Sequence, residues 1–176
     1  MIVVCSDTHS RTGHELSEHM LKAVREADLV VHAGDFTTTA ALSAFRAESD
    51  RLFAVHGNAD DAEVREHLPS ARTFDVGGVT TALTHRQHGG ATALAMFGRS
   101  RGASLVVSGH THRPSVTHAD DVTLLNPGSH ADPRGARPGY AELVPGDNVV
   151  RGRLLDPGGT VVDSFEVRRG GDAGDI

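Results

Sequence analysis

The stretch LVVSGHTH, from Leu105 to His112, joins a short apolar run to a glycine and then to two histidines one residue apart. A similar stretch, VVCSDTH, runs from Val3 to His9 and again ends in two polar side chains, those of Asp7 and His9. In an extended segment, residues i and i+2 project to the same side. The two stretches therefore predict two strands that deliver pairs of ligands to one place.

The composition predicts one globular domain. The chain has 176 residues, of which 38% are hydrophobic and 4% aromatic, and this length is enough to bury a core. We expect a single domain over residues 1–169 and a disordered tail over residues 170–176. The sequence has no apolar run long enough to cross a bilayer and no secretion signal at its start, which predicts a cytoplasmic protein without a membrane partner.

The charge and the single cysteine narrow the function classes. A net charge of -6 argues against extended binding to a nucleic acid backbone, although a nucleotide in a metal-lined pocket stays compatible with it. Cys5 alone excludes an internal disulfide and a multi-cysteine zinc site. Lys22 is the one lysine among 17 basic residues, a bias that fits either a high-salt habitat or GC-rich coding.

The order of apolar runs predicts an α/β fold. Strand-like runs at 2–5, 29–33 and 52–55 alternate with helical patterns at 15–26 and up to residue 48, which is typical of βαβ units. From residue 72 onward, runs at 73–76 and 79–84 and at 139–144 and 149–154 form hairpin pairs, and a helix is expected near 91–99. Two sheets that face each other, with helices outside, would bury all these runs.

Polar side chains follow the predicted strands. They are Asp7, His9, Asp35, Asn58, His85, His110 and His112. Loops at the carboxyl ends of strands converge, and oxygen and imidazole ligands without thiolate suit Mn²⁺, Fe²⁺, Ni²⁺, Co²⁺ or Zn²⁺. Seven ligands exceed the need of one ion, so we predict two divalent ions that share the carboxylate of Asp35.

The charge of such a centre predicts its substrate. Two divalent ions, two carboxylates and a bridging hydroxide leave a positive site, which one phosphodiester anion would neutralise. Metal-bound water loses its proton near neutrality, and two ions can stabilise the charge that develops on phosphoryl oxygens. We therefore expect a small phosphodiester or a nucleotide as substrate.

The ordered motifs resemble those of the calcineurin-like metallophosphoesterase superfamily. They are Asp7-Thr8-His9, Gly34-Asp35, Gly57-Asn58, His85 and Gly109-His110-Thr111-His112. Further along, Asn126-Pro127-Gly128-Ser129, Pro133-Arg134-Gly135 and Tyr140 resemble the small bacterial and archaeal phosphodiesterases of that superfamily. Single pieces such as Gly34-Asp35 are common, whereas the ordered set is specific and spans nearly the whole chain.

The resemblance implies a fold and a division of ligands. The fold would be two facing mixed β-sheets sandwiched between α-helices. One ion would take Asp7, His9, Asp35 and His112, and the other would take Asp35, Asn58, His85 and His110. Asp35, Asn58 and His85 would then hold the hydroxide and the phosphate. Mn²⁺ is the first choice of metal, and a homodimer is compatible with the resemblance.

Two departures from the family pattern concern proton transfer. Many members place a general-acid histidine after Gly-Asn, where this chain has Ala59 followed by Asp60. His-Gly-His of the family appears here as His85-Arg86-Gln87-His88, so His88 is displaced by one position. His88 and Asp60 are the remaining candidates for the acid, although orienting a loop is the preferred role for Asp60.

Two arginines and one turn are further candidates for roles at the predicted centre. Arg11 and Arg134 are candidates for contacting the phosphate, and the alternative is that they are ordinary surface residues. The turn Asn126 to Ser129 is expected to support the site rather than to supply ligands.

Two further functions compete with the phosphodiesterase. The fold of this subgroup is also that of a eukaryotic retromer subunit, which implies a non-catalytic scaffold as the alternative. A phosphomonoesterase, including a phosphoprotein phosphatase, is the third reading, weakened by Ala59 and by the small size. A scaffold has no need for buried aspartates, which are costly without ions, so the complete ligand set favours the enzyme.

Overall fold

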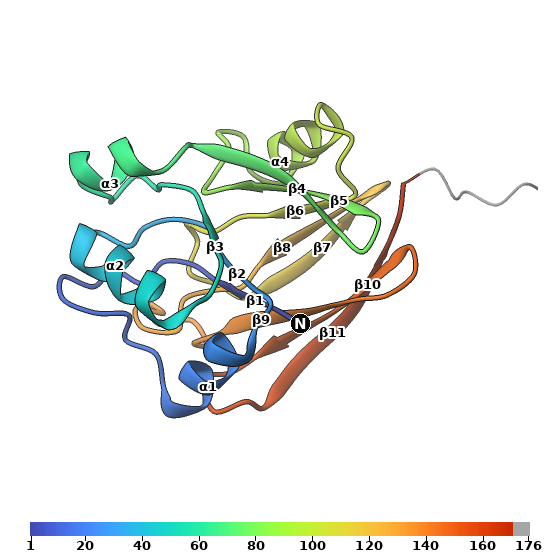
Figure 1. The fold of residues 1–176 in the computed structure, drawn as a ribbon. Helices are drawn as coiled ribbons and strands as arrows, with labels where there is room; N and C mark the ends of the chain where they lie inside the picture. The colour runs from blue at the N-terminus through green and yellow to red at the C-terminus, as the bar shows by residue number, and fades with distance from the viewer. Residues whose placement is uncertain (171–176) are drawn as a thin grey trace, which may run out of the picture.

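The computed structural model describes residues 1–170, which form two mixed β-sheets with helices on their outer faces (Figure 1). The first sheet has six strands in the order β11-β10-β9-β1-β2-β3. Its strands are β1 Ile2–Cys5, β2 Leu29–His32, β3 Leu52–Ala54, β9 Tyr140–Pro145, β10 Val149–Leu155 and β11 Val161–Arg168. The three strands from the first third of the chain are parallel, and β9 joins β1 in antiparallel register.

The second sheet has five strands in the order β4-β5-β6-β8-β7. These are β4 Ala71–Val76, β5 Val79–Thr84, β6 Leu105–Val107, β7 Ser115–Ala119 and β8 Val122–Asn126. The pairs β5/β6 and β6/β8 are parallel, whereas the hairpins β4/β5 and β7/β8 are antiparallel. Both sheets are thus mixed, as predicted.

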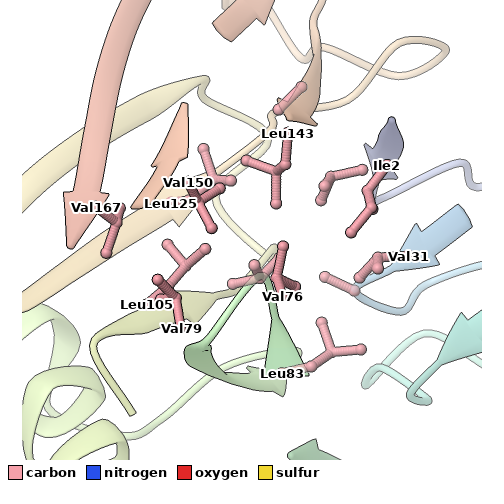
Figure 2. Close-up of a cluster of buried hydrophobic side chains, with 14 of the residues drawn as sticks. Ile2, Val31, Val76, Val79, Leu83, Leu105, Leu125, Leu143, Val150 and Val167 are labelled. Carbon is pink, nitrogen blue, oxygen red and sulfur yellow. The ribbon is translucent and has the colours of Figure 1, made fainter. Parts of the chain in front are cut away.

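Three hydrophobic clusters hold four layers together. The central cluster lies between the sheets, where Ile2, Val31, Leu83, Leu105 and Leu143 meet (Figure 2). A second cluster packs the outer face of the first sheet against helices, and a third packs the second sheet against a single helix. Because strands such as β1 and β6 are covered on both faces, they read as continuous apolar runs rather than as alternating ones.

The helices are α1 Glu18–Glu26, α2 Thr39–Glu48, α3 Ala62–His67 and α4 Gly90–Arg99. Ser17 caps α1 and Thr38 caps α2, each accepting a hydrogen bond from a backbone N–H three residues on. Helices α1, α2 and α3 contribute to the cluster on the first sheet, and α4 contributes to that on the second. Within the described residues, no helix combines the length and the apolar character needed to cross a membrane.

The structure corrects the start of the first helix, adds a helix that was not predicted and leaves the predicted tail untested. The first helix begins at Glu18 rather than near residue 15, because Glu15 has a left-handed φ of 54° and Ser17 is the cap. Helix α3 was not predicted, since its six residues bury only Val64 and leave no periodic signal. The tail predicted for 170–176 lies outside the described residues except for Gly170.

Candidate metal centre

The seven predicted ligands follow five strands drawn from both sheets. Asp7 and His9 follow β1, Asp35 follows β2 and Asn58 follows β3, while His85 follows β5 and both His110 and His112 follow β6. The two sheets therefore meet at the centre through the loops at the carboxyl ends of their strands.

The local geometry of these loops differs from the sequence prediction. Strand β1 ends at Cys5 and β6 ends at Val107, so neither the pair Asp7/His9 nor the pair His110/His112 lies on a strand. Five ligand residues have left-handed backbones, namely Asp7 (φ 55°), His9 (φ 47°), Asp35 (φ 61°), His110 (φ 72°) and His112 (φ 59°). The prediction that extended segments aim these pairs is therefore wrong, and turns that L-residues rarely adopt direct the side chains instead.

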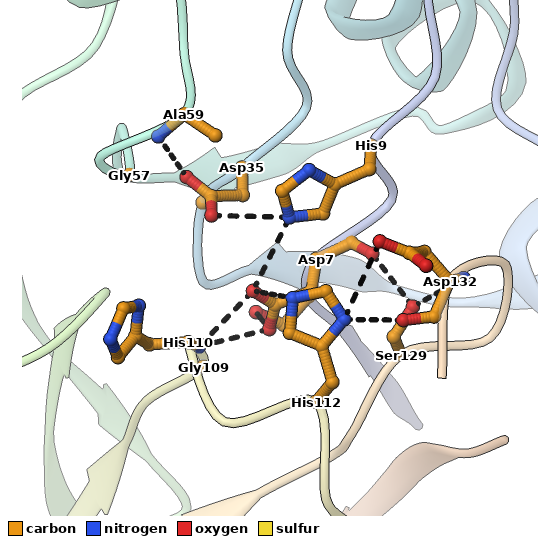
Figure 3. A network of polar contacts seen from close by, with 12 residues as sticks. Asp7, His9, Asp35, Gly57, Ala59, Gly109, His110, His112, Ser129 and Asp132 are labelled. Atoms are coloured by element: carbon orange, nitrogen blue, oxygen red, sulfur yellow. Dashed lines mark hydrogen bonds and ion pairs between the residues drawn. The ribbon is translucent and has the colours of Figure 1, made fainter. Parts of the chain in front are cut away.

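Asp7 lies fully buried at the middle of the centre (Figure 3). Its carboxylate accepts a hydrogen bond from the Ser6 hydroxyl at 2.6 Å and from the His110 backbone N–H at 3.0 and 3.1 Å. Nε2 of His112 lies 3.4 Å from Asp7 Oδ1, and Nε2 of His9 lies 4.0 Å from the same oxygen. Asp7, His9 and His112 thus form one compact group of donor atoms.

Asp35 contacts histidines from both predicted ligand sets. Its Oδ2 lies 3.2 Å from Nε2 of His9 and 3.3 Å from Nε2 of His85, while Oδ1 accepts a hydrogen bond from the Ala59 N–H at 2.8 Å. Asp7, Asp35 and His85 form a second group whose donor atoms all lie within 4.8 Å of one another. The two groups are therefore contiguous.

Two of the histidines are held with Nε2 directed into the centre. Nδ1 of His85 donates to the backbone carbonyl of Ala33 at 2.8 Å, and Nδ1 of His112 donates to the carbonyl of Asp132. Because Nδ1 is bonded to a backbone carbonyl in each ring, Nε2 is the nitrogen that faces the carboxylates, and it would offer its lone pair to a metal ion once it has lost its proton. This arrangement of imidazoles and carboxylates fits divalent transition metals.

The carboxylates and His85 shift one another's ionisation. Burial raises the pKa of Asp7 above its ordinary value, although His85, the Ser6 hydroxyl and His112 act in the opposite direction. Burial would raise the pKa of Asp35 as well, but hydrogen bonds from His85 and His9 hold it well below its usual range. Burial lowers the pKa of His85, yet Asp35 and Asp7 outweigh this and raise it overall. The centre is a site of concentrated negative charge that cations would neutralise.

Asn58 and His110 lie at the edge of the centre. Oδ1 of Asn58 lies 3.1 Å from Nε2 of His85, so it joins the second group. The His110 ring is exposed and its centroid lies 5.3 Å from that of His85, while Nη1 of Arg86 lies 3.4 Å from its Nε2. Figure 3 shows this ring apart from His9 and His112. Within residues 1–170, His110 belongs to neither compact group of donor atoms.

The candidate acids differ in their surroundings. Both carboxylate oxygens of buried Asp60 are occupied, because they accept hydrogen bonds from the N–H groups of Asp35 (3.0 Å), Thr37 (2.7 Å) and Gly57 (2.6 Å). Asp60 thus ties the Asp35 loop to the Asn58 loop, which is the orienting role preferred from the sequence. His88 is exposed on the loop before α4.

The candidate arginines lie on the His9 side of the centre. Nη2 of Arg134 is 3.5 Å from Nε2 of His9, and its Nε donates to Asp132 at 3.0 Å. Arg11 is exposed and lines a cleft together with His9 and Asp132. Asp132 was missed from the sequence, since its contact with His112 runs through a backbone carbonyl that no motif reveals.

The turn after β8 is hydrogen-bonded to the loops that carry the predicted ligands after β1 and β6. Nδ2 of Asn126 donates to the Gly109 carbonyl at 2.7 Å and to Oγ1 of Thr111 at 3.0 Å. The hydroxyl of Ser129 donates to the Asp7 carbonyl at 2.7 Å. The turn contacts the loops that carry Asp7 and His110 through their backbones, which agrees with the supporting role expected for it.

Comparisons with known proteins agree with the residue pattern. Residues 1–145 match the calcineurin-like phosphoesterase superfamily domain. A probable metallophosphoesterase of Methanothermobacter thermautotrophicus is 31% identical over 173 residues, covering 96% of this chain and 99% of the relative. A phosphodiesterase of Methanocaldococcus jannaschii is 25% identical over 138 residues, covering 72% and 82% respectively. In structure, vacuolar protein sorting 29 of Cryptosporidium parvum has a TM-score of 0.81 at 18% identity, over 95% of this chain and 97% of that one, which concerns the fold alone.

Proposed function

Because the chain belongs to the calcineurin-like phosphoesterase superfamily, we propose that it is a metal-dependent phosphodiesterase acting on small phosphodiesters or nucleotides. The observation that carries this proposal is the position of Asp35 Oδ2, which lies 3.2 Å from His9 Nε2 and 3.3 Å from His85 Nε2. A single carboxylate oxygen within reach of one histidine from each proposed ligand set is what a pair of ions sharing one ligand requires.

The division of ligands that the family resemblance implies is carried into the proposal, and the contacts of Asp35 support it. Asp7, His9 and His112 would hold one ion and Asn58 with His85 the other, with Asp35 shared between them. When bound, the ions supply Lewis acidity that lowers the pKa of coordinated water and offsets charge on the phosphoryl oxygens. Mn²⁺ is the proposed metal, with Ni²⁺, Fe²⁺, Co²⁺ or Zn²⁺ as the other candidates. His110, whose ring lies apart, is proposed as an outer ligand of the His85 site.

Hydrolysis of a diester forms one P–O bond to the water oxygen and breaks the P–O bond to the leaving group. The leaving oxygen then needs a proton unless it departs as a stable anion. Ala59 offers none, and both oxygens of Asp60 are already bonded to backbone N–H groups. His88, the other candidate, is exposed on the loop before α4. We therefore expect aryl phosphodiesters to turn over faster than alkyl ones, because an aryl oxide needs little acid assistance.

The leaving-group expectation is measured with Mn²⁺-loaded protein. Turnover of bis(p-nitrophenyl) phosphate is compared with that of an alkyl p-nitrophenyl diester and of a dialkyl diester, following each released alcohol. Rates that fall by orders of magnitude as the pKa of the leaving group rises would support the absence of a general acid. Equal rates would mean that a proton donor reaches the leaving oxygen.

The proposal as a whole is tested by Asp35→Asn. Asparagine keeps the shape of aspartate and tolerates the left-handed φ of 61°, so the substitution removes charge without disturbing the backbone. We expect bound metal to fall by at least one ion per chain in elemental analysis, and diesterase turnover to fall at least about 100-fold. The matched control is Asp120→Asn, another aspartate with a left-handed φ, here 54°, on the exposed β7/β8 turn.

The scaffold alternative is separated by the same measurements. Protein that binds two ions yet hydrolyses no diester would favour the scaffold. An Asp35→Asn variant that keeps wild-type metal content and turnover would refute the shared carboxylate. Turnover of aryl phosphomonoesters above that of diesters would favour the phosphomonoesterase.

A further inference from the structure

A cleft of about 590 Å³ opens beside Asn58 and His85. It is lined by the loops after β3 and β5, by α3 and by the end of α4, and three arginines face it: Arg65, Arg86 and Arg101. Among the described residues, no aspartate or glutamate lines this cleft, although the chain carries 23 acidic and 17 basic residues. The cleft is therefore cationic on a protein that is acidic overall.

The three guanidinium groups are not neutralised by the protein. Within residues 1–170, none of them lies within ion-pair distance of a carboxylate, whereas Arg99 and Arg153 elsewhere on the surface each have acidic partners. Unpaired cations gathered at one cleft next to a metal centre repel one another. An anionic ligand would relieve this repulsion.

Two of the three cationic groups, those of Arg65 and Arg101, are anchored by contacts that leave N–H groups free. Arg65 donates from Nε to the Asp60 carbonyl at 2.9 Å and from Nη2 to the Asn58 carbonyl at 2.7 Å, so its Nη1 remains available. The Arg101 guanidinium lies 3.8 Å from the centroid of the Phe97 ring, which holds it by stacking. Donors fixed in this way lose little conformational entropy when they bind an anion.

We propose that the preferred substrate carries a second phosphate group, which Arg86 and Arg101 bind in this cleft while the scissile diester lies at the metal centre. This inference rests on the proposed phosphodiesterase function and names its substrate class: a nucleotide diester with an additional terminal phosphate. Guanidinium groups bind phosphate through paired N–H donors, and the volume of the cleft is in the range of pockets for small ligands. Arg65, which is bonded to the backbone, positions the Asn58 loop beside it.

The first test measures binding to the full-length, Mn²⁺-loaded protein by calorimetry. Thymidine 3′,5′-bisphosphate and thymidine 5′-phosphate differ by one phosphate group, so their affinity ratio reports the second phosphate. We expect the bisphosphate to bind at least about tenfold more tightly, and Arg101→Gln or Arg86→Gln to bring the ratio close to one. Arg51→Gln is the matched control, because Arg51 also stacks on a phenylalanine, Phe53, but does not line the cleft.

The second test measures hydrolysis of thymidine 5′-(p-nitrophenyl phosphate) with and without a 3′-phosphate. A higher kcat/KM for the 3′-phosphorylated probe, lost in Arg101→Gln but kept in Arg51→Gln, supports the inference. Equal affinities and equal kcat/KM values for the two members of each pair would overturn it. If neither probe is hydrolysed but the bisphosphate still binds more tightly, the cleft assignment stands and the proposed diesterase function fails.

If Arg101→Gln does not fold, as its melting temperature would reveal, Arg86→Gln gives the same comparison. A ratio that stays at the wild-type value in folded Arg86→Gln and Arg101→Gln would show that other groups bind the second phosphate.

Discussion

At the scale of single residues, the centre depends on backbones that ordinary L-residues avoid. A left-handed φ costs about 1 kcal/mol or more for a residue with a side chain, and five of the proposed ligand residues adopt one. Interlocking backbone hydrogen bonds hold these loops, because the N–H of Asp7 donates to the Gly34 carbonyl at 2.9 Å and that of His9 to the Asp35 carbonyl at 3.0 Å. Because these bonds run between backbone groups, we expect them to preorganise the proposed ligands.

Two glycines of the motifs are required because a larger residue would collide with side chains from elsewhere in the chain. A Cβ on Gly57 would lie 2.0 Å from Asp35 Oδ1, and a Cβ on Gly109 would lie 1.9 Å from the Ser6 hydroxyl and 2.6 Å from Asp7 Oδ2. Each glycine therefore makes room for one of the two buried carboxylates. The Gly-Asn and Gly-His pairs could be read from the sequence as motifs, but not as spacers for residues elsewhere in the chain.

We predict that Gly57→Ala and Gly109→Ala displace Asp35 and Asp7, respectively. Each substitution should cost about 1–3 kcal/mol of unfolding free energy and weaken metal binding by at least about tenfold, because the new methyl group overlaps the ligand. Chemical denaturation and metal titration measure the two effects. Gly13→Ala is the control, since its Cβ would meet its nearest neighbour at an ordinary 3.7 Å. Wild-type metal affinity in both site variants would refute the spacing role.

At the scale of elements, strands were easier to predict than the loops between them. The apolar runs at β1, β2 and β6 and the Gly77-Gly78 hairpin locate the strands, and the ordered motifs predicted a family membership that the comparisons confirm. The short helix α3 was not predicted, because a single buried residue gives no periodicity. The position of the His110 ring depends on a turn conformation, and the role of Asp132 depends on its backbone carbonyl. Neither can be read from the identity of a side chain.

One element-level contact joins the end of β8 to the ligand loop after β6. Asn126 donates to the carbonyl of Gly109 and to Oγ1 of Thr111, and its Oδ1 accepts from the Gly128 N–H at 2.9 Å. Buried Asn126 therefore satisfies the backbone of two loops at once. Only an amide offers donors and an acceptor in this arrangement.

We predict that Asn126→Asp loosens the loop that carries His110 and His112. The carboxylate cannot donate to the Gly109 carbonyl, so a buried acceptor faces a buried anion, which should cost about 1–3 kcal/mol of stability. Metal affinity should fall about 10–100-fold although no ligand is changed. Asn148→Asp, in the β9/β10 hairpin away from the centre, controls for the substitution itself. Unchanged metal affinity in Asn126→Asp would show that the loop holds its shape without this contact.

At the scale of the whole molecule, buried side chains outside the centre also hold distant segments together, and His130 is one of them. His130, on the connection between β8 and β9, donates from Nε2 to the carbonyl of His14 at 2.9 Å and packs edge-on against Phe45 of α2 at 6.1 Å between centroids. It thus joins three segments that are distant in the chain. Its Nδ1 has no hydrogen-bond partner among the described residues.

This burial gives the fold a predictable dependence on pH. Burial lowers the pKa of His130 from 6.5 to about 4, and the charge of His14 acts in the same direction, although the bond to the His14 carbonyl opposes them. The folded state therefore keeps the ring neutral, while the unfolded state takes up a proton below its ordinary pKa. The stability contributed by the neutral ring is complete above pH 6.5 and is lost as pH falls from about 6.5 to about 4. The loss amounts to about 3 kcal/mol at most.

Denaturant titrations between pH 7 and about 4, in the presence of a chelator so that metal release does not contribute, measure this loss. His130→Gln has a side chain that does not titrate and can still donate to the His14 carbonyl, so its stability should be lower at pH 7 but fall less steeply with acidification. His19→Gln is the control, because His19 is exposed and should leave the slope unchanged. Parallel curves for wild type and His130→Gln would show that acid sensitivity arises elsewhere, with fully buried His32, whose pKa burial also lowers, as the next residue to substitute.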